Sequence, residues 1–366
     1  MTLILVATIF TVAAAQDHAR QPRLDLVAEY GDAKLRLIKF WDPPNGIMLT
    51  SRRIFRSANA GRNWTEIPGA SDGKSAYQDA AISSDRVWLL SRDRLLNAEE
   101  GRLERLPVPP LGNYGGEIVG IHVRESDASI WLYGATYRVM EAGEDGPNNA
   151  IKKLQDGRLA ILVPLILVSR DGGMSWERIL PLNKSGLDSG SRIVKLLSVG
   201  DSTLIAGTDY RILESDDDGQ TWNPAELRGF ACEGPSHLDG DLRSLDLLGD
   251  GDFLNQGWFS ASDGSVYKTE NGLVWCKTLR ENLESALESI RFRSPHQGIA
   301  TDLKGRLMWT QDGGQNWSQV LATESGFSRF EQVLSEDHRH FWALTTSALY
   351  TVTLSEQFQR TITDPQ

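Results

Sequence analysis

The sequence predicts an all-β protein, a β-propeller of seven four-stranded blades, with six or eight blades as the alternative counts. The first observation behind this prediction is a motif of the form S/T-x-D/N-x-G-x-x-W that recurs along the chain. The second is a short apolar run that recurs seven times. The third is a strand-like segment, residues 23–30, that can close the ring by joining the last blade. Self-similarity at a period of about 40–50 residues is typical of propellers.

The motif has a role in turn formation at each fixed position. An Asp or Asn side chain accepts hydrogen bonds from backbone N–H groups one or two residues on, which closes a turn between two strands. Glycine permits a positive φ, and Ser or Thr adds a side-chain bond to the backbone. The tryptophan opens the next strand and fills space between neighbouring blades. The copies are Ser57, Asn59, Gly61 and Trp64; Ser169, Asp171, Gly173 and Trp176; Ser215, Asp217, Gly219 and Trp222; Thr310, Asp312, Gly314 and Trp317; and, one residue shorter, Thr269, Asn271 and Trp275.

Two further blades lack a complete motif. Residues 95–106, "LLNAEEGRLERL", align with the first copy, with Asn97 in the serine position, Glu99 in the Asp/Asn position and Gly101 retained. Residues 330–354 have the strand pattern of a blade without a motif. A short apolar run accompanies every blade, at 46–50, 87–91, 130–134, 203–207, 257–261, 298–302 and 341–345.

All blades share one ring, so a single domain is expected over residues 23–358. The segment 23–30, "RLDLVAEY", is expected to pair with 348–354, "ALYTVTL", and to remove an exposed sheet edge. The segment 357–363, "QFQRTIT", competes for the same place.

The N-terminal segment predicts export. Residues 1–15 read as a signal peptide, with an apolar core followed by three alanines and no basic residue at the start. An uncleaved N-terminal anchor is the alternative, although the apolar run is shorter than the ~20 residues that a spanning helix needs. The mature chain is thus expected to be secreted or periplasmic, without a transmembrane segment. In that compartment Cys232 and Cys276 can pair, unless the strands place them at opposite ends of a blade.

Composition limits the classes of function. The formal net charge is −11, which argues against nonspecific binding of nucleic acid or of an anionic membrane. The sequence contains no Gly-rich phosphate loop, H-E-x-x-H, C-x-x-C or G-x-S-x-G. We therefore expect no cofactor and no bound metal.

The motif resembles the Asp-box, or BNR, repeat of sialidases, sortilin-type receptors, xyloglucan-cleaving enzymes and photosystem II assembly factors. In those families the box is the turn between the third and fourth strands of a blade, on the face away from the main binding surface. The architecture is most similar to that of the assembly factors, which are exported single propellers without a catalytic set. The resemblance implies a noncatalytic scaffold that binds a protein or glycan partner on the face opposite the boxes.

The largest departure from the repeat is an insert at 135–160 in the third blade. Its arms are expected to extend the second and third strands as a β-hairpin, with the tip over or beside the central opening. Loops on a rigid scaffold often carry binding. The candidate contact residues are Tyr137, Arg138, Lys152 and Lys153 in the insert and His237 in the long entry to the fifth blade.

A glycoside hydrolase of the sialidase type is the alternative function. The resemblance would then require three arginines that converge on a substrate carboxylate, a tyrosine nucleophile with a glutamate partner, and an aspartate. The nearest string to the sialidase F/Y-R-I-P stretch is "RIFRSA", which lacks the proline and leads into a motif turn. No catalytic residue is therefore assigned.

Overall fold

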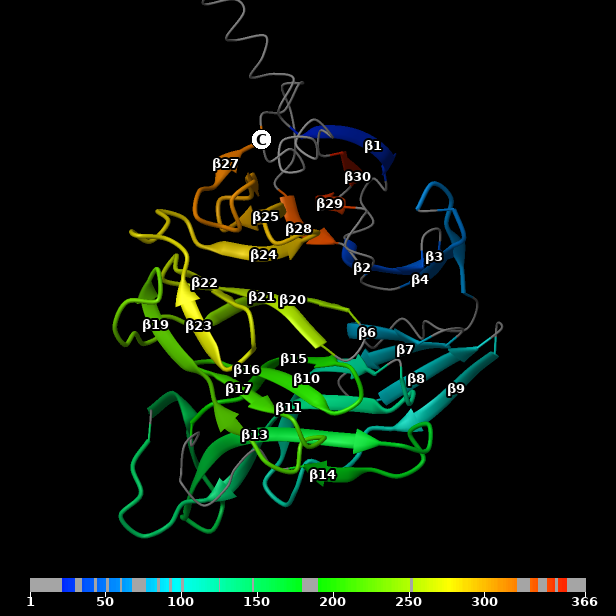
Figure 1. The fold of residues 1–366 in the computed structure, drawn as a ribbon. Helices are drawn as coiled ribbons and strands as arrows, with labels where there is room; N and C mark the ends of the chain where they lie inside the picture. The colour runs from blue at the N-terminus through cyan, green and yellow to red at the C-terminus, as the bar shows by residue number, and fades with distance from the viewer. Residues whose placement is uncertain are drawn as a thin grey trace, which may run out of the picture.

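Seven sheets, antiparallel except for one outer strand of blade five, form the blades of a ring (Figure 1). The structure is a computed structural model and describes residues 22–29, 35–42, 45–50, 53–59, 61–67, 77–83, 86–91, 94–99, 102–124, 126–146, 148–179, 190–250, 253–320, 330–334, 341–345 and 348–353. The predicted fold class and the count of seven blades are confirmed. The expected signal peptide at 1–15, the motif-like Gly101 and the competing segment 357–363 lie outside the described residues.

Each blade follows the chain from its innermost to its outermost strand, except where noted below. Blades one and two are β2 (Leu35–Asp42), β3 (Asn45–Thr50), β4 (Ile54–Ser57) and β5 (Thr65–Glu66), then β6 (Tyr77–Ser83), β7 (Arg86–Ser91), β8 (Arg94–Glu99) and β9 (Arg102–Pro107). Blade three is β10 (Gly116–Val123), β11 (Ile130–Val139), β13 (Leu159–Ser169) and β14 (Glu177–Ile179), with β12 (Ile151–Lys153) and the short 3-10 helix η1 (Asn148–Ala150) in its insert.

The remaining blades continue this order. Blade four is β15 (Ile193–Val199), β16 (Thr203–Thr208), β17 (Ile212–Ser215) and β18 (Asn223–Pro224). Blade five is β20 (Leu242–Asp250), β21 (Phe253–Ala261), β22 (Val266–Thr269) and β23 (Val274–Lys277), and it carries a fifth, outer strand, β19 (Glu226–Phe230). Blades six and seven are β24 (Leu287–Phe292), β25 (Gly298–Asp302), β26 (Leu307–Thr310) and β27 (Ser318–Gln319), then β28 (Phe330–Leu334), β29 (Phe341–Thr345), β30 (Ala348–Thr353) and β1 (Arg23–Glu29).

The first strands of neighbouring blades contact one another around the axis, from β2 through β28 and back to β2. The seven apolar runs of the sequence form the second strand of each blade, where nearly every residue is buried. A β-bulge interrupts the pairing of the first strand with the second in each blade, for example between Leu35 and Leu37 and between Leu287 and Ser289. Bulges bend a strand and increase its twist, which suits strands that crowd around an axis.

Strand β1 closes the ring as the sequence predicts. It pairs antiparallel with β30, with Arg23 opposite Thr353 and Glu29 opposite Ala348. The outermost strand of blade seven thus comes from the N-terminal part of the chain, and β1 covers the edge that β30 would otherwise expose.

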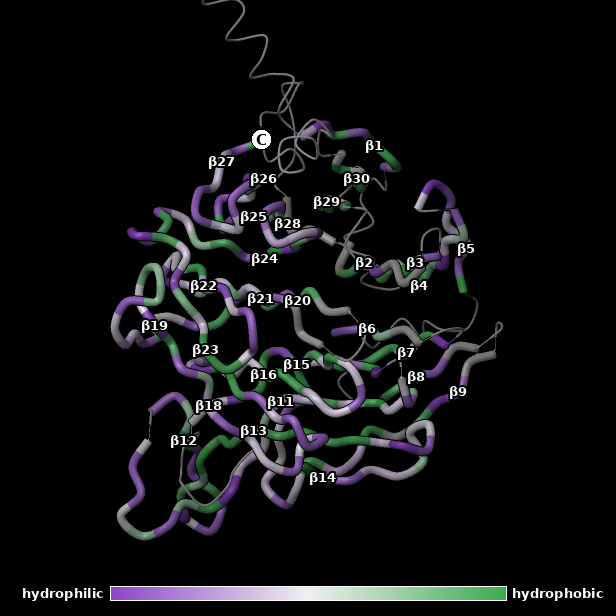
Figure 2. The backbone as a smooth tube through the Cα atoms, viewed as in Figure 1, coloured by the Kyte–Doolittle hydropathy of each residue, from purple (hydrophilic) through white to green (hydrophobic). Residues whose placement is uncertain are grey.

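The hydrophobic core lies between the blades. Each of seven buried clusters joins residues of two consecutive blades, and the inner strands are mainly hydrophobic in Figure 2. Each motif tryptophan packs against the cluster between its own blade and the preceding one. Trp222 and Trp275 are buried, whereas Trp64, Trp176 and Trp317 are half-buried. All five side chains therefore pack between blades.

The motif forms the turn between the third and fourth strands, and its polar side chains bond one another. The Ser169 hydroxyl donates to Asp171 (2.8 Å) and accepts from the Gly173 N–H (2.7 Å). Asp171 in turn accepts from the N–H of Ser175, four residues on (2.8 Å). This differs from the predicted bond one or two residues on, because the turn is wider than a simple Asx turn. In the shorter copy Asn271 accepts from the N–H groups of Leu273 and Val274, two and three residues on.

Removing the carboxylate from a motif turn should destabilise the ring but leave the structure of the opposite face unchanged. In Asp312→Ala the Asn316 N–H, which now donates to Asp312 at 2.9 Å, loses its acceptor. We expect the free energy of unfolding to fall by about 1–3 kcal/mol in chemical denaturation. Asp312→Asn is the control, because Asn59 fills the same position in the first copy and should bond similarly. Equal losses in the two variants would contradict this role.

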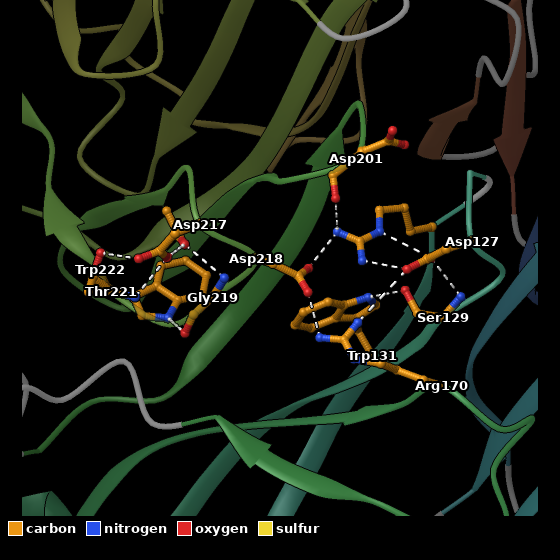
Figure 3. A network of polar contacts seen from close by, with 12 residues as sticks. Asp127, Ser129, Trp131, Arg170, Asp201, Asp217, Asp218, Gly219, Thr221 and Trp222 are labelled. Carbon is orange, nitrogen blue, oxygen red and sulfur yellow. Dashed lines mark hydrogen bonds and ion pairs between the residues drawn. The ribbon is translucent and has the colours of Figure 1, made fainter.

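A buried arginine links blades three and four on the motif face (Figure 3). The Arg124 side chain is only 3% exposed. Its guanidinium donates to Asp127 at 2.6 Å within blade three, and to Asp218 (2.7 Å) and the Asp201 carbonyl (2.6 Å) of blade four. Arg170 bonds the other oxygen of Asp218 but is 45% exposed. The two arginines and two carboxylates form a network that spans the blade boundary.

Strand β19 explains how the two cysteines meet. It runs parallel to β23 on the outside of blade five, with Arg228 opposite Cys276. The chain then turns back through Cys232, which forms a disulfide with Cys276 across a Cα–Cα distance of 4.8 Å. In a blade of four strands no strand would lie on the outer side of β23, next to Cys276. The disulfide could therefore not be predicted from the blade pattern.

Candidate functional site

The face opposite the motif turns carries the insert of blade three. Its arms form the predicted hairpin, since β11 and β13 stay in register as far as Val139 opposite Ala160. The strand order corrects the expected direction of the insert. β12 pairs with the outer side of β13, so the insert widens the blade away from the axis and not toward the central opening. Figure 1 shows it projecting at the lower left.

The insert brings two of the predicted contact residues together and adds two others. The Lys152 ammonium lies 4.9 Å from the centroid of the Tyr137 ring and donates to the Tyr114 carbonyl at 3.3 Å. Arg158 lies 5.9 Å from the centroid of the Tyr114 ring and donates to its hydroxyl at 3.3 Å. Two tyrosines and two cations thus form one group, which we call the insert cluster. Cation–ring contacts at exposed sites are attractive by about 0.5–1 kcal/mol each.

The insert cluster combines aromatic surface with accessible positive charge. Tyr114 and Tyr137 are half-buried, whereas Lys152 and Arg158 are exposed. Arg158 is also paired with Asp156 at 2.7 Å. Such a group can hold an acidic or aromatic group of a partner through charge, hydrogen bonds and ring contacts.

The other predicted contact residues lie outside the insert cluster. Arg138 is paired with Glu144 of the insert tip (2.8 Å), whose carboxylate also accepts from the Glu141 N–H, so Arg138 holds the shape of the tip. Lys153 is exposed on β12. His237 lies in the crossover between β19 and β20, is largely exposed and pairs with Asp239 at 2.9 Å. It is not brought together with the insert.

Sequence reasoning alone gave no role to Tyr114 or Arg158. Tyr114 belongs to the connection from blade two to blade three, and that connection packs on β11 through the Tyr137 N–H to Gly115 O bond (3.2 Å). The one feature of the sequence that could have indicated Tyr114 is an aromatic residue next to a Gly-Gly pair at the start of a blade. Tyr114 meets Lys152 and Arg158, 38 and 44 positions later, because of the length of the hairpin, which the sequence does not specify.

Polar side chains also meet near the axis. Lys39 of blade one bonds Asp79 of blade two at 3.1 Å, and Asp79 accepts from the Ile121 N–H of blade three at 3.0 Å. His122 lies 2.8 Å from the Ser198 hydroxyl of blade four. Desolvation, with a contribution from the nearby charge of Lys39, lowers the pKa of His122 to about 3. An imidazole with so low a pKa is a weak general base, and its contact with Ser198 links blades three and four.

His122 should make stability depend on pH. In the unfolded chain its pKa returns to about 6.5, so below that pH the unfolded state binds one proton more than the folded state. The free energy of unfolding is therefore expected to fall by about 1–2 kcal/mol between pH 6.5 and 4.5. His122→Gln should show a shallower decline in thermal or chemical melts, while His237→Gln, whose side chain is exposed, should keep that of the parent. Parallel profiles for all three proteins would refute the assignment.

Two arginines at the insert-bearing end of the first strands are engaged by carboxylates. Arg192 bonds Glu117 at 3.0 Å and Asp209 at 3.2 Å, and Arg243 lies 3.8 Å from Glu288. A sialidase site requires arginines free to bind a substrate carboxylate. These two are not arranged for that purpose.

The part of the chain that the structure describes has neither a metal-binding cluster nor a membrane-spanning helix. There, no group of three or more His, Cys, Asp or Glu side chains is arranged to hold a metal ion. Nor does any described helix have the length and apolarity needed to cross a membrane.

Solved structures with a similar fold include both binding proteins and an enzyme. No family model and no curated protein matches the sequence. The chain is similar to YCF48 bound to D1 peptide (TM-score 0.61, 14% identity, covering 91% of this chain and 96% of that one). It is also similar to YCF48 from Cyanidioschyzon merolae (0.62, 13%, 90% and 98%) and to a streptogramin B lyase (0.61, 11%, 91% and 98%). These likenesses show that the chain has the fold of a seven-bladed β-propeller.

Proposed function

We propose that this protein is an exported, noncatalytic propeller that binds an extended segment of a partner protein at the insert cluster. The observation that carries the proposal is the contact of Tyr114, Tyr137, Lys152 and Arg158 on the face opposite the motif turns. The cluster is built on the largest departure from the blade repeat, which the ring itself does not need. The assignment of the motif turns to the Asp-box class is part of this proposal, because it defines the opposite face as the binding face.

Two further observations support the proposal. A propeller of the same fold, YCF48, has been seen with a D1 peptide bound, although a shared fold does not by itself transfer a function. The Cys232–Cys276 disulfide suits an oxidising compartment, because disulfides rarely persist in the cytosol. Both agree with a secreted or periplasmic binding protein.

The insert should be removable without unfolding the ring. Because Met140 N–H bonds Leu159 O, replacing residues 141–158 with Asn-Gly rejoins β11 and β13 through a two-residue hairpin turn. Each blade contacts mainly its neighbours, so circular dichroism and the denaturation midpoint should stay close to those of the parent. The shortened protein should lose partner binding. Loss of the fold would instead assign the insert a structural role.

Binding is tested with a displayed library of twelve-residue peptides and, in parallel, a glycan array. We expect enriched peptides that carry acidic and aromatic residues, with affinities at least tenfold weaker for Tyr137→Ala and Lys152→Gln. Lys304→Gln is the matched control, because Lys304 is an exposed lysine paired with Glu284 on blade six. Peptides that bind all three variants equally would refute the proposal. Selective binding to the glycan array would replace the protein partner with a glycan.

A further inference from the structure

A cleft lies at the outer edge of the ring between blades five and six. It has a volume of about 450 Å³, which falls within the range of small-molecule sites. Strand β19 supplies one wall through Phe230 and the disulfide half Cys232, and the blade-six motif turn supplies another through Asp312 and Gly313. The cleft thus depends on two features that only blade five has among the described blades, an outermost strand parallel to its neighbour and a disulfide.

The Lys268 side chain lies in this cleft on a row that crosses blade five. Trp258 is opposite Lys268, and Lys268 is opposite Cys276, so the three side chains share the face toward blade six. The ammonium is 5.5 Å from the centroid of the Trp258 ring, and Trp258 donates to the Gly313 carbonyl at 3.0 Å. The tryptophan is fixed between the blades and orients the lysine.

The charge of Lys268 has no close counter-ion. Among the residues that the structure describes, no carboxylate forms an ion pair with it. Burial lowers the pKa of its ammonium, whereas Glu270, which also lines the cleft, favours its charged form. Asp312 also lines the cleft, but its carboxylate is occupied by Thr310 and Asn316. A half-buried charge without a partner is costly, and an anion bound in the cleft would remove that cost.

The fold does not require a lysine at this position. Lys268 directly precedes the first residue of the motif, and the equivalent residues of the other four copies are Arg56, Val168, Glu214 and Trp309. Basic, apolar, acidic and aromatic side chains therefore all satisfy the blade. Blade one also has a basic residue there, but β19 and the disulfide that wall the cleft beside Lys268 belong to blade five.

The rest of the cleft indicates the shape of the anion. Phe230, Val274 and the Cys232–Cys276 disulfide give it an apolar wall. We propose that this cleft binds a small aromatic carboxylate, with the carboxylate on Lys268 and the ring against Phe230. This site is separate from the insert cluster and does not depend on it.

The test uses phenylacetate as the probe and its neutral analogue phenylacetamide as the comparison, both measured by titration calorimetry and by amide shifts in NMR. We expect phenylacetate to bind with shifts centred on residues 268–278, and phenylacetamide to bind at least fivefold more weakly. Lys268→Met, which keeps the apolar stem, should weaken phenylacetate at least fivefold, whereas Lys304→Gln and the insert-deleted protein should bind as the parent does. The inference is overturned if the parent does not bind phenylacetate, if the amide binds equally well, or if Lys268→Met has no effect.

Discussion

Replacing Trp275 with alanine should lower the free energy of unfolding by about 3–5 kcal/mol, which is the cost of truncating a fully buried aromatic side chain. The indole is 0% exposed, lies 5.1 Å from the Phe259 ring between centroids and donates to the Gly272 carbonyl at 2.6 Å. The truncation would open a cavity between blades four and five and remove that bond. Denaturant titration at constant m-value measures the effect.

A half-buried member of the same set provides the comparison. Trp176→Ala removes the equivalent side chain of blade three, but that indole nitrogen has no hydrogen-bond partner among the described residues and part of the ring already faces water. The loss should be clearly smaller than for Trp275→Ala. A reversed order would show that burial between blades does not set the contribution of these side chains.

Arg124→Ala should cost about 2–4 kcal/mol. Removing one partner of a buried ion pair leaves the other charges without compensation, and here the partners Asp127 and Asp218 keep 41% and 27% of their side-chain surface exposed, which moderates the loss. Arg170→Ala, on the same carboxylates but 45% exposed, should cost less than about 1 kcal/mol. The two variants are compared by urea denaturation at low and high salt, and similar losses in both would refute the special role of Arg124.

The repeat makes the arrangement of the blades predictable. The contacts between segments that are distant in the sequence could not be predicted. The motif spacing and the apolar runs identify seven blades, because each blade must bury both faces against its neighbours. The pairing of β1 with β30 follows from the same need to cover an edge. Nothing in the local pattern of residues 226–230, however, distinguishes a fifth parallel strand from a loop.

Part of the candidate site could also be predicted. The insert was recognisable from its length, and Tyr137 and Lys152 from their residue types. The outward position of β12 was not, because a chain leaving β11 can return on either side of the hairpin. The meeting of Tyr114 with Lys152 and Arg158, and that of Arg124 with Asp218, depend on three-dimensional neighbours that no short-range pattern encodes.

The mixed origin of blade seven has a consequence for how the protein matures. Its outer strand β1 is made early, but its partner β30 is made more than 300 residues later. Until β30 has been made, β1 has no strand with which to pair. Met48 of blade one and Trp342 of blade seven, which belong to the same buried cluster, cannot yet pack together. Ring closure must therefore follow synthesis of nearly the whole chain, so synthesis that stops before residue 348 leaves an open ring whose unpaired strand edges are accessible to chaperones and proteases.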